Sequence, residues 1–562
     1  MTPDKRARPL GYSKGRQTRA ADRAHVRALL GTMPRRRDLL IEALHRLQDH
    51  DQHLSPDTLA ALAGEFGLAQ TEVFEVATFY HHFDVLADGQ PAPAPLTVRV
   101  CDSLSCQMAG ADALLHALRD GLGGEVRVQP VPCVGRCEQA PVAIVHQHPV
   151  AHADATRVQA AIRDGQRQCA PPGSAGPAQA ATHPAYATLA QLIDDDPDRE
   201  TLFARLEQAG LRGMGGAGFP AGRKWRIVAA QPAARLLVVN ADEGEPGTFK
   251  DRHLLESDPH PFLAGMLIAA WATGCEACYI YLRDEYAGIR AWLETALQEL
   301  RDAPPFDTTR WPMPEMHLRR GAGAYICGEE SGLLESLEGR RGMPRLRPPY
   351  IAEVGLFGRP TLAHNVETLH WVPAILAGDD AAFAAHGRRG RQGLRRFSVS
   401  GRVAEPGVKL APAGISVNEL IAEHCGGMAP GHTLYGYLPG GASGGILPAS
   451  LADEPLDFDT LQRHGSFIGS AAVIVLSQAD RARDAAANLM RFFRHESCGQ
   501  CTPCRVGTAK ACTMLEAAHW PAQTLQELAQ VMSDASICGL GQAAPNPFLT
   551  VMRHFRHEVS DD

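Results

Sequence analysis

The sequence lacks any long hydrophobic run. Its longest candidates, residues 262–273 and 471–476, are much shorter than the roughly 18–20 apolar residues that span a bilayer. Neither sign of charge predominates strongly, because a formal net charge of −8 is spread over 562 residues. A dedicated nucleic-acid-binding protein would instead be strongly basic. With 45% hydrophobic and 21% charged residues, the composition indicates an ordinary soluble globular protein.

The first 37 residues have few acidic residues and lack an apolar segment. They contain eleven lysines and arginines against only Asp4 and Asp22, and nothing in them resembles the hydrophobic region of a secretory signal. An arginine-rich, acid-poor start is also typical of an organellar presequence, but we favour a disordered basic extension that docks on a partner. We therefore expect a cytoplasmic protein.

A chain of this length is too long for one hydrophobic core, so several domains are expected. After the basic extension at 1–37, residues 38–90 are predicted to be helical. Their apolar residues recur at helical spacing, and Ser55 followed by Pro56 is a typical helix start. Residues 91–165 have the pattern of a small α/β domain. Residues 166–185, rich in Pro, Ala, Gly and Ser, are predicted to be a linker.

The second half of the chain is predicted to hold three further domains. Apolar strands alternate with helices over 186–395, as expected of a mainly parallel sheet. Short β-type runs and many glycines over 396–470 indicate a small β-rich domain, and 471–562 is predicted to be mainly helical. The expected fold class is therefore multidomain α/β.

Four cysteines near the C-terminus are the most informative residues. Cys498, Cys501 and Cys504 form a C-x2-C-x2-C run, and 33 residues separate the last of them from Cys538. Three closely spaced thiolates and a remote fourth can ligate a [4Fe–4S] cluster. A structural zinc ion is the alternative, although zinc sites usually use two separate C-x2-C pairs.

A second set of cysteines lies in the predicted small α/β domain. Cys101 and Cys106 form a C-x4-C pair, and Cys133 and Cys137 form a C-x3-C pair, each after a predicted strand. Four thiolates can hold a [2Fe–2S] cluster or a zinc ion, and a second redox cluster is the preferred interpretation beside the first. We expect Cys275, Cys278, Cys327, Cys425 and Cys512 to be core thiols and Cys169 to be incidental.

A glycine-rich run, LRGMGGAGFPAGRKW at 211–225, could cradle a phosphate, because glycines leave backbone N–H groups unshielded. It matches neither a G-x-G-x-x-G nor a Walker pattern. Two acidic stretches strengthen the case. One follows a strand at 240–252, where open α/β sheets bind ligands, and the other is GAYICGEES at 323–331. Their carboxylates could accept hydrogen bonds from ribityl or ribose hydroxyls, or could be solvated surface charges.

Several of these motifs together resemble a known family. The runs LRGMGGAGFPAGRKW, NADEGEPGTFKDR, AYICGEES, HNVETL and ESCGQCTPCR resemble the NADH-binding flavoprotein subunit of respiratory complex I over about 186–562. The N-terminal part, with VFEVATFYHHF, both cysteine pairs and CEQAPVAIV, resembles the thioredoxin-like [2Fe–2S] subunit of the same complex. The chain therefore looks like a fusion of the two. This implies a thioredoxin-like domain, a Rossmann-like FMN/NAD domain, a ubiquitin-like β-grasp domain and a helical bundle with the [4Fe–4S] cluster.

The resemblance also implies a set of binding residues. The expected FMN contacts are Gly213, Gly216, Lys224, Asn240, Asp242, Glu243, Tyr325, Gly328, Glu329, Asn365 and Thr368. The expected NAD(H) contacts are Phe219, Glu245, Glu330 and Tyr350, and Glu245 and Glu330 form an acidic clamp at the reacting centre. Two positions depart from the family pattern: Met214 replaces an arginine, and His364 replaces the first of two asparagines.

Residues next to the cysteine and flavin motifs indicate which partner subunit is expected. HNVETL, SICGLGQAAPNP and CDSLSC are most similar to the diaphorase subunits of NAD-linked molybdenum formate dehydrogenases. This implies reduction of NAD⁺ through FMN with electrons from formate, oxidised on a partner molybdenum/Fe–S subunit, because this chain shows no molybdopterin or nickel site. We expect a hetero-oligomer, or a dimer of heteromers, without nucleic acid or membrane insertion. The alternatives are the diaphorase of an NAD-reducing hydrogenase or of complex I, and a non-catalytic Fe–S or zinc scaffold.

Overall fold

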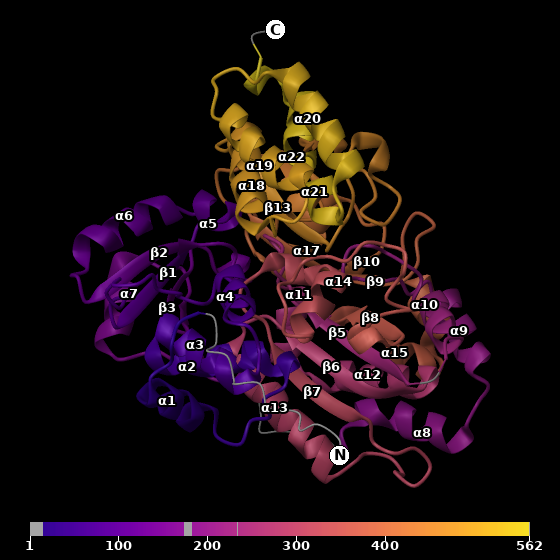
Figure 1. Cartoon of the computed structure of the whole chain (residues 1–562). Helices are drawn as coiled ribbons and strands as arrows, with labels where there is room; N and C mark the ends of the chain where they lie inside the picture. The colour runs from indigo at the N-terminus through magenta and orange to yellow at the C-terminus, as the bar shows by residue number, and fades with distance from the viewer. Residues whose placement is uncertain (1–14, 173–181, 233, 561–562) are drawn as a thin grey trace. The chain divides into compact units, whose positions relative to one another are not determined.

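The computed structural model describes residues 15–172, 182–232 and 234–560 (Figure 1). The chain divides into two compact units, one containing Met1–Pro93 with Glu338–Arg341 and the other containing Ala94–Leu337 with Gly342–Asp562. Among the described residues, no helix is both long and apolar enough to cross a membrane. Part of the predicted linker, at 173–181, lies outside the described residues.

The first unit is helical up to Phe79, so the helical prediction for 38–90 is wrong for 80–90, which form turns and extended chain. Its helices are α1 (Ala20–Leu30), α2 (Leu40–Asp51), α3 (Pro56–Phe66) and α4 (Gln70–Phe79). The predicted cap is present, since Ser55 Oγ accepts a hydrogen bond of 3.1 Å from the Thr58 amide. The expectation of a disordered extension is wrong for α1, which forms because Val26 and Leu30 are completely buried. Residues 1–14 lie outside the described part.

The second unit begins with a four-stranded sheet of order β2-β1-β3-β4. Strand β1 (Leu96–Cys101) is parallel to β2 (Val126–Val131) and antiparallel to β3 (Ala143–Val145), which pairs with β4 (His148–Val150). The helices are α5 (Leu104–Met108), α6 (Ala111–Gly121) and α7 (Ala155–Arg163). Apolar residues of β1, α6 and α7 form the core. Cys101 is the last residue of β1, Cys106 lies in α5, and Cys133 and Cys137 follow β2.

A parallel sheet of order β7-β6-β5-β8 forms the next domain, as expected. Its strands are β5 (Arg235–Ala241), β6 (Cys275–Leu282), β7 (Glu315–Arg320) and β8 (Thr361–Asn365). The helices are α8 (Ala187–Asp195), α9 (Arg199–Gln208), α10 (Ala221–Ala229), α11 (Lys250–Ser257), α12 (His260–Thr273), α13 (Ala287–Asp302), α14 (Glu330–Leu337), α15 (Val366–Ala374) and α16 (Asp380–Ala385). The apolar run at 262–273 lies in α12, a helix buried on every side.

The β-rich domain is a five-stranded mixed sheet of order β10-β9-β13-β11-β12. Its elements are β9 (Leu394–Gly401), β10 (Gly407–Pro412), α17 (Val417–His424), β11 (Leu434–Leu438), β12 (Leu447–Pro448) and β13 (Ala472–Ser477). Strand β13 is central and parallel to β9, so this domain extends to Ser477 instead of ending at 470. Its six residues are all buried, which explains why the run is apolar without alternation.

The C-terminal part is helical and carries the last cysteine set. It contains α18 (Ala482–Glu496), α19 (Thr502–Leu515), α20 (Ala522–Ala535), α21 (Gly539–Ala543) and α22 (Asn546–His554), coloured yellow in Figure 1. Helix α18 packs on α19 and α22, and its apolar face is buried. Cys501 and Cys538 are the N-cap residues of α19 and α21, so the bundle brings separate helix starts to one place.

Candidate cofactor-binding site

The glycine-rich run forms a closed loop between α9 and α10. The Gly213 amide donates to the Phe219 carbonyl at 2.9 Å, and the Gly218 amide donates to the Gly213 carbonyl at 3.2 Å. A Cβ at Gly222 would lie 2.1 Å from the carbonyl oxygen of Phe203, so that glycine is required by packing. A Cβ at Gly213 would instead meet nothing nearer than 3.6 Å. Space is thus open beside Gly213, whose own N–H and carbonyl close the loop.

The loop lies against the ends of two neighbouring strands. Asn240 and Asn365 are register partners at the ends of β5 and β8. Asn240 Nδ2 donates to the Gly328 carbonyl at 2.8 Å, and Thr368 Oγ1 accepts a hydrogen bond of 2.9 Å from the Met214 amide. The structure therefore brings four of the predicted FMN segments together at the carboxyl edge of the sheet, where open α/β sheets bind ligands.

A buried lysine supports this edge and was not among the predicted site residues. The Lys250 side chain is 1% exposed, and its Nζ lies 2.8 Å from Asp251 Oδ1 and 3.1 Å from Glu367 Oε2. Burial alone would lower the pKa of Lys250, but Asp251, Glu367 and Glu243 together raise it above its ordinary value. Lys250 therefore stays charged and holds the starts of α11 and α15 together. Its only sequence signal was its place in the motif NADEGEPGTFKDR.

Two predicted FMN residues have their carboxyl groups buried beneath the site. Glu243 accepts from the amides of Asp251 at 2.8 Å and Arg252 at 3.0 Å, and from Tyr286 Oη at 3.0 Å, so its side chain caps α11. Burial raises the pKa of Glu243 to about 7. Burial likewise raises the pKa of Asp242 to about 8, although part of that residue remains exposed. Asp242 is consequently protonated at neutral pH and able to donate a hydrogen bond.

The predicted clamp residue Glu245 is held by two hydroxyl-bearing residues. Glu245 Oε2 accepts from Tyr325 Oη at 2.9 Å, and Oε1 accepts from the amide of Ser443 at 2.8 Å and from its hydroxyl. Burial raises the pKa of Glu245. Ser443 comes from the β-rich domain and was missed by sequence reasoning. The glycine-rich run around it, at 440–445, was the available signal.

The second acidic stretch begins α14. Glu329 accepts hydrogen bonds of 2.9 Å from the amides of Ser331 and Gly332, and Arg347 forms ion pairs with both Glu329 and Glu330. Glu329 and Glu330 are therefore brought together, with a guanidinium beside them that sequence reasoning did not single out.

Two predicted NAD(H) contacts, Phe219 and Tyr350, and the predicted FMN contact Lys224 have different environments. Phe219 and Tyr350 are 37% and 55% exposed, so both rings are accessible to a ligand. Lys224 Nζ donates to the Ala363 carbonyl at 3.1 Å, and burial lowers the pKa of Lys224. The departure at position 364 is explained by packing, because buried His364 Nε2 accepts a 2.7 Å hydrogen bond from Trp225 Nε1. Burial holds the pKa of His364 well below its usual range, so the imidazole is neutral.

The N-terminal cysteine set is assembled in the interior. Cys101, Cys106, Cys133 and Cys137 are at most 4% exposed, and all are free thiols. Cys133 Sγ lies 3.3 Å from Cys137 Sγ and accepts a hydrogen bond from the Gly135 amide at 3.4 Å. Cys101 is also in contact with Cys106 and Cys133. Four converging, unbridged thiols are a donor set that fits a [2Fe–2S] cluster.

The C-terminal cysteines line one small cavity. Its walls are Cys498, Cys501, Cys504 and Cys538 with Ile326, Pro344, Ser497, Gln500, Ile537 and Leu540. The amides of Leu540 and Gly541, at the start of α21, point to Cys538 and favour its thiolate, although burial raises the pKa of Cys538 to about 12. Four thiols around a mainly apolar cavity fit a [4Fe–4S] cluster. Cys275 and Cys278 lie buried in β6, as expected of core thiols.

The segment GLGQAAPNP, on which the partner expectation rested, makes contacts within the chain. A Cβ at Gly541 would lie 2.5 Å from Ser536 Oγ and 2.9 Å from Cys504 Cβ, so glycine is needed beside the cysteine cavity. Asn546 Nδ2 donates to the Ser443 carbonyl at 2.9 Å, which supports the serine that holds Glu245. The segment thus has a structural role that applies with any partner.

Three family descriptions match the chain in separate regions. Residues 26–166 match "Thioredoxin-like [2Fe-2S] ferredoxin", 206–374 match "Nuo51 FMN-binding domain", and 484–562 match "NADH-ubiquinone oxidoreductase-F iron-sulfur binding region". These regions contain both cysteine sets and the glycine-rich loop.

Curated relatives and solved structures agree with this division. The chain is 42% identical over 376 residues to the F subunit of the NADH-quinone oxidoreductase of Rhodobacter capsulatus, covering 65% of this chain and 87% of that one. It is 41% identical over 380 residues to the mitochondrial NADH dehydrogenase [ubiquinone] flavoprotein 1 of Dictyostelium discoideum, covering 65% and 79%. A chain of an H₂-reduced NAD⁺-reducing [NiFe]-hydrogenase matches with a TM-score of 0.81 and 34% identity, covering 94% of this chain and 95% of that one.

Proposed function

Since the chain belongs to the family of the NADH-quinone oxidoreductase F subunits, we propose that it is the NAD(H)-linked flavoprotein subunit of a multisubunit oxidoreductase. The domains that bind FMN, NADH, a [2Fe–2S] and a [4Fe–4S] cluster are present in it. It exchanges electrons between NAD(H) and a partner subunit on which the primary substrate reacts.

One observation carries the proposal. The short segment Tyr325–Gly328 contacts both the predicted NAD(H) residue Glu245 and the cavity of the C-terminal cysteines. Tyr325 Oη donates a hydrogen bond to Glu245, and the next residue, Ile326, lines that cavity. The Tyr325 amide donates at 2.9 Å to Glu496, two residues before Cys498. A non-catalytic scaffold would need neither this direct connection nor the open space beside Gly213.

The chain's own residues then bind and orient the reactants. When bound, FMN supplies the conversion between the two-electron chemistry of NAD(H) and the one-electron chemistry of iron–sulfur clusters. The Gly213 loop binds the phosphate of FMN. Asn240, Asn365 and Thr368 position the carboxyl edge of the sheet, against which the flavin lies. Phe219 and Tyr350 stack on the dinucleotide, and Glu245 and Glu330 accept hydrogen bonds from it, which orients the nicotinamide.

The test is made on the purified, iron-loaded chain. We expect bound flavin and NADH–dye reductase activity. Absence of both from a folded preparation that contains its iron would overturn the proposal and leave the scaffold alternative.

For the electron donor we propose formate, oxidised on a molybdenum partner. Support comes from the likeness of HNVETL and CDSLSC to formate dehydrogenase diaphorases. Molecular hydrogen is the second candidate, favoured by the likeness to a chain of an NAD⁺-reducing hydrogenase over 94% of this chain. The native complex distinguishes them: formate-dependent NAD⁺ reduction with bound molybdenum supports the first, and H₂-dependent reduction with bound nickel overturns it.

A further inference from the structure

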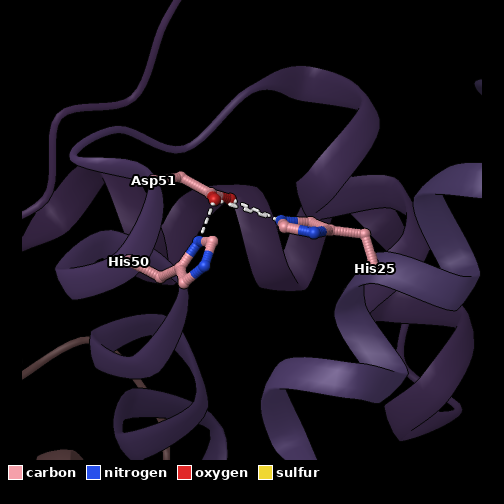
Figure 2. A group of neighbouring side chains, drawn as sticks. All are labelled: His25, His50 and Asp51. Atoms are coloured by element: carbon pink, nitrogen blue, oxygen red, sulfur yellow. Dashed lines mark hydrogen bonds and ion pairs between the residues drawn. The ribbon is translucent and has the colours of Figure 1, made fainter.

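A trio of side chains in the first unit converges on one carboxylate (Figure 2). His25 comes from the middle of α1, and His50 and Asp51 are the last two residues of α2. His25 Nε2 lies 2.8 Å from one carboxylate oxygen of Asp51, and His50 Nδ1 lies 2.7 Å from the other. Figure 2 shows both rings directed at the same carboxylate from different helices. All three ligand atoms lie within 4.8 Å of one another.

We propose that His25, His50 and Asp51 form a binding site for a divalent transition-metal ion, with Zn²⁺ as its probe. Two imidazole nitrogens and a carboxylate oxygen are ligands that Zn²⁺ accepts, with bonds of about 2.0–2.2 Å to each. A tetrahedral ion with such bonds separates its ligand atoms by roughly 3.3 Å. The two nitrogen–oxygen distances therefore need to open by about half an ångström. The side chains of His25 and His50 are 40% and 58% exposed, which leaves both rings free to move and the remaining positions open to water.

The charges around the trio favour a cation. The Asp51 carboxylate lies between the two imidazole rings and presents one oxygen to each. The last carbonyl groups of α2 add negative potential where His50 and Asp51 lie. Nearby arginines are directed elsewhere, since Arg27 pairs with Glu65 and Arg46 donates to the Leu30 carbonyl. Within the described ranges, the ion pairs of Asp51 are those with the two histidines.

Occupation of the site would join α1 to α2. Helix α1 has few large buried residues of its own, with Val26 and Leu30 as its two buried positions. A metal bridge from His25 to the end of α2 would add a second attachment. Ligand binding to the folded state alone raises its stability, so Zn²⁺ should protect α1 from hydrogen exchange and proteolysis.

The experiment uses the full chain with its iron–sulfur clusters loaded. After equilibration with Zn²⁺ and removal of excess metal, we expect one additional zinc equivalent. Its X-ray absorption spectrum should show nitrogen and oxygen neighbours at about 2.0 Å with imidazole scattering and no sulfur shell near 2.3 Å. His25→Ala and Asp51→Asn should each lose that equivalent, whereas His53→Ala, a neighbouring histidine outside the trio, should retain it.

Two results would overturn the proposal. One is a sulfur-rich zinc spectrum, which would mean that the metal occupies vacated cysteine sites. The other is equal zinc content in the wild type, His25→Ala and Asp51→Asn proteins. Amide hydrogen exchange of residues 20–30 gives an independent measurement, and protection by Zn²⁺ in the wild type but not in Asp51→Asn supports the site.

Discussion

The guanidinium of Arg283 donates a hydrogen bond of 2.7 Å to the main-chain oxygen of Cys133, which lies 150 residues earlier in the chain. The same side chain donates to the main-chain oxygen of Glu243 and pairs with Glu285 at 2.9 Å. Gly135 packs on the ring of Tyr286, because a Cβ at Gly135 would lie 2.3 Å from Tyr286 Oη. The loop with the N-terminal cysteines is thus attached directly to the loop that underlies the predicted flavin edge.

Replacement of Arg283 should test this attachment. Arg283→Gln removes a buried positive charge beside Cys133 and takes a donor from two buried main-chain carbonyls, which typically costs about 1–3 kcal/mol. We expect a lower midpoint of unfolding and a more negative reduction potential for the N-terminal cluster, measured by EPR-monitored titration. Arg283→Lys keeps the charge and should preserve most of the potential. An unchanged potential in a folded Arg283→Gln protein would contradict the electrostatic role.

The two cysteine sets should be separable from hydride transfer. Cys538→Ala removes one thiol of the C-terminal cavity, and we expect loss of the [4Fe–4S] EPR signal and of electron transfer to the partner. Reduction of bound flavin by NADH, followed by stopped-flow absorbance, should survive. Cys512→Ala is the matched control, because that buried cysteine of α19 lies outside the cavity lining. Loss of flavin reduction in folded Cys538→Ala would show that the proposed division of roles is wrong.

Two glycines of the same loop should respond differently to alanine. Gly222→Ala would place a Cβ 2.1 Å from the Phe203 carbonyl, and overpacking of this kind typically costs about 1–3 kcal/mol. Gly213→Ala has space for its Cβ, so the stability of the flavin-free protein should stay near the wild-type value while FMN affinity falls. Urea unfolding and flavin retention on gel filtration measure the two effects. Equal flavin retention by Gly213→Ala and wild type would contradict the proposed role of the Gly213 loop in binding FMN.

Asp242 should make the flavin-free protein less stable as the pH rises. Its pKa is about 8 in the folded protein, against 3.8 as the ordinary value. Between these values the unfolded chain has released the proton that the folded protein retains, so stability is complete near pH 4 and declines up to about pH 8. Glu243, with a pKa of about 7, acts in the same direction. Thermal midpoints across this range should therefore fall less steeply for Asp242→Asn than for wild type, and parallel curves would contradict the assignment.

Much of the site was predictable because its signals are local. Cysteine spacing predicted both thiol sets, Ser55–Pro56 predicted the start of α3, and the glycine-rich run predicted a loop. Each signal depends on residues that are close in the sequence, where spacing and backbone preference carry the information. The expectation of a formate-oxidising partner subunit has weaker support. The segment around Cys538 is explained by contacts with Ser536, Cys504 and Ser443 inside the chain.

By itself the sequence determined the thiol sets, the glycine loop and the order of the domains, since these depend on residue type and spacing. Tertiary structure alone decided which distant groups meet. Ser443 reaches Glu245 across 198 residues, Arg283 reaches Cys133 across 150, and His364 accepts from Trp225 across 139. Such contacts have no periodicity in the sequence, because a buried charge or ring takes whichever complementary partner the packed core places beside it.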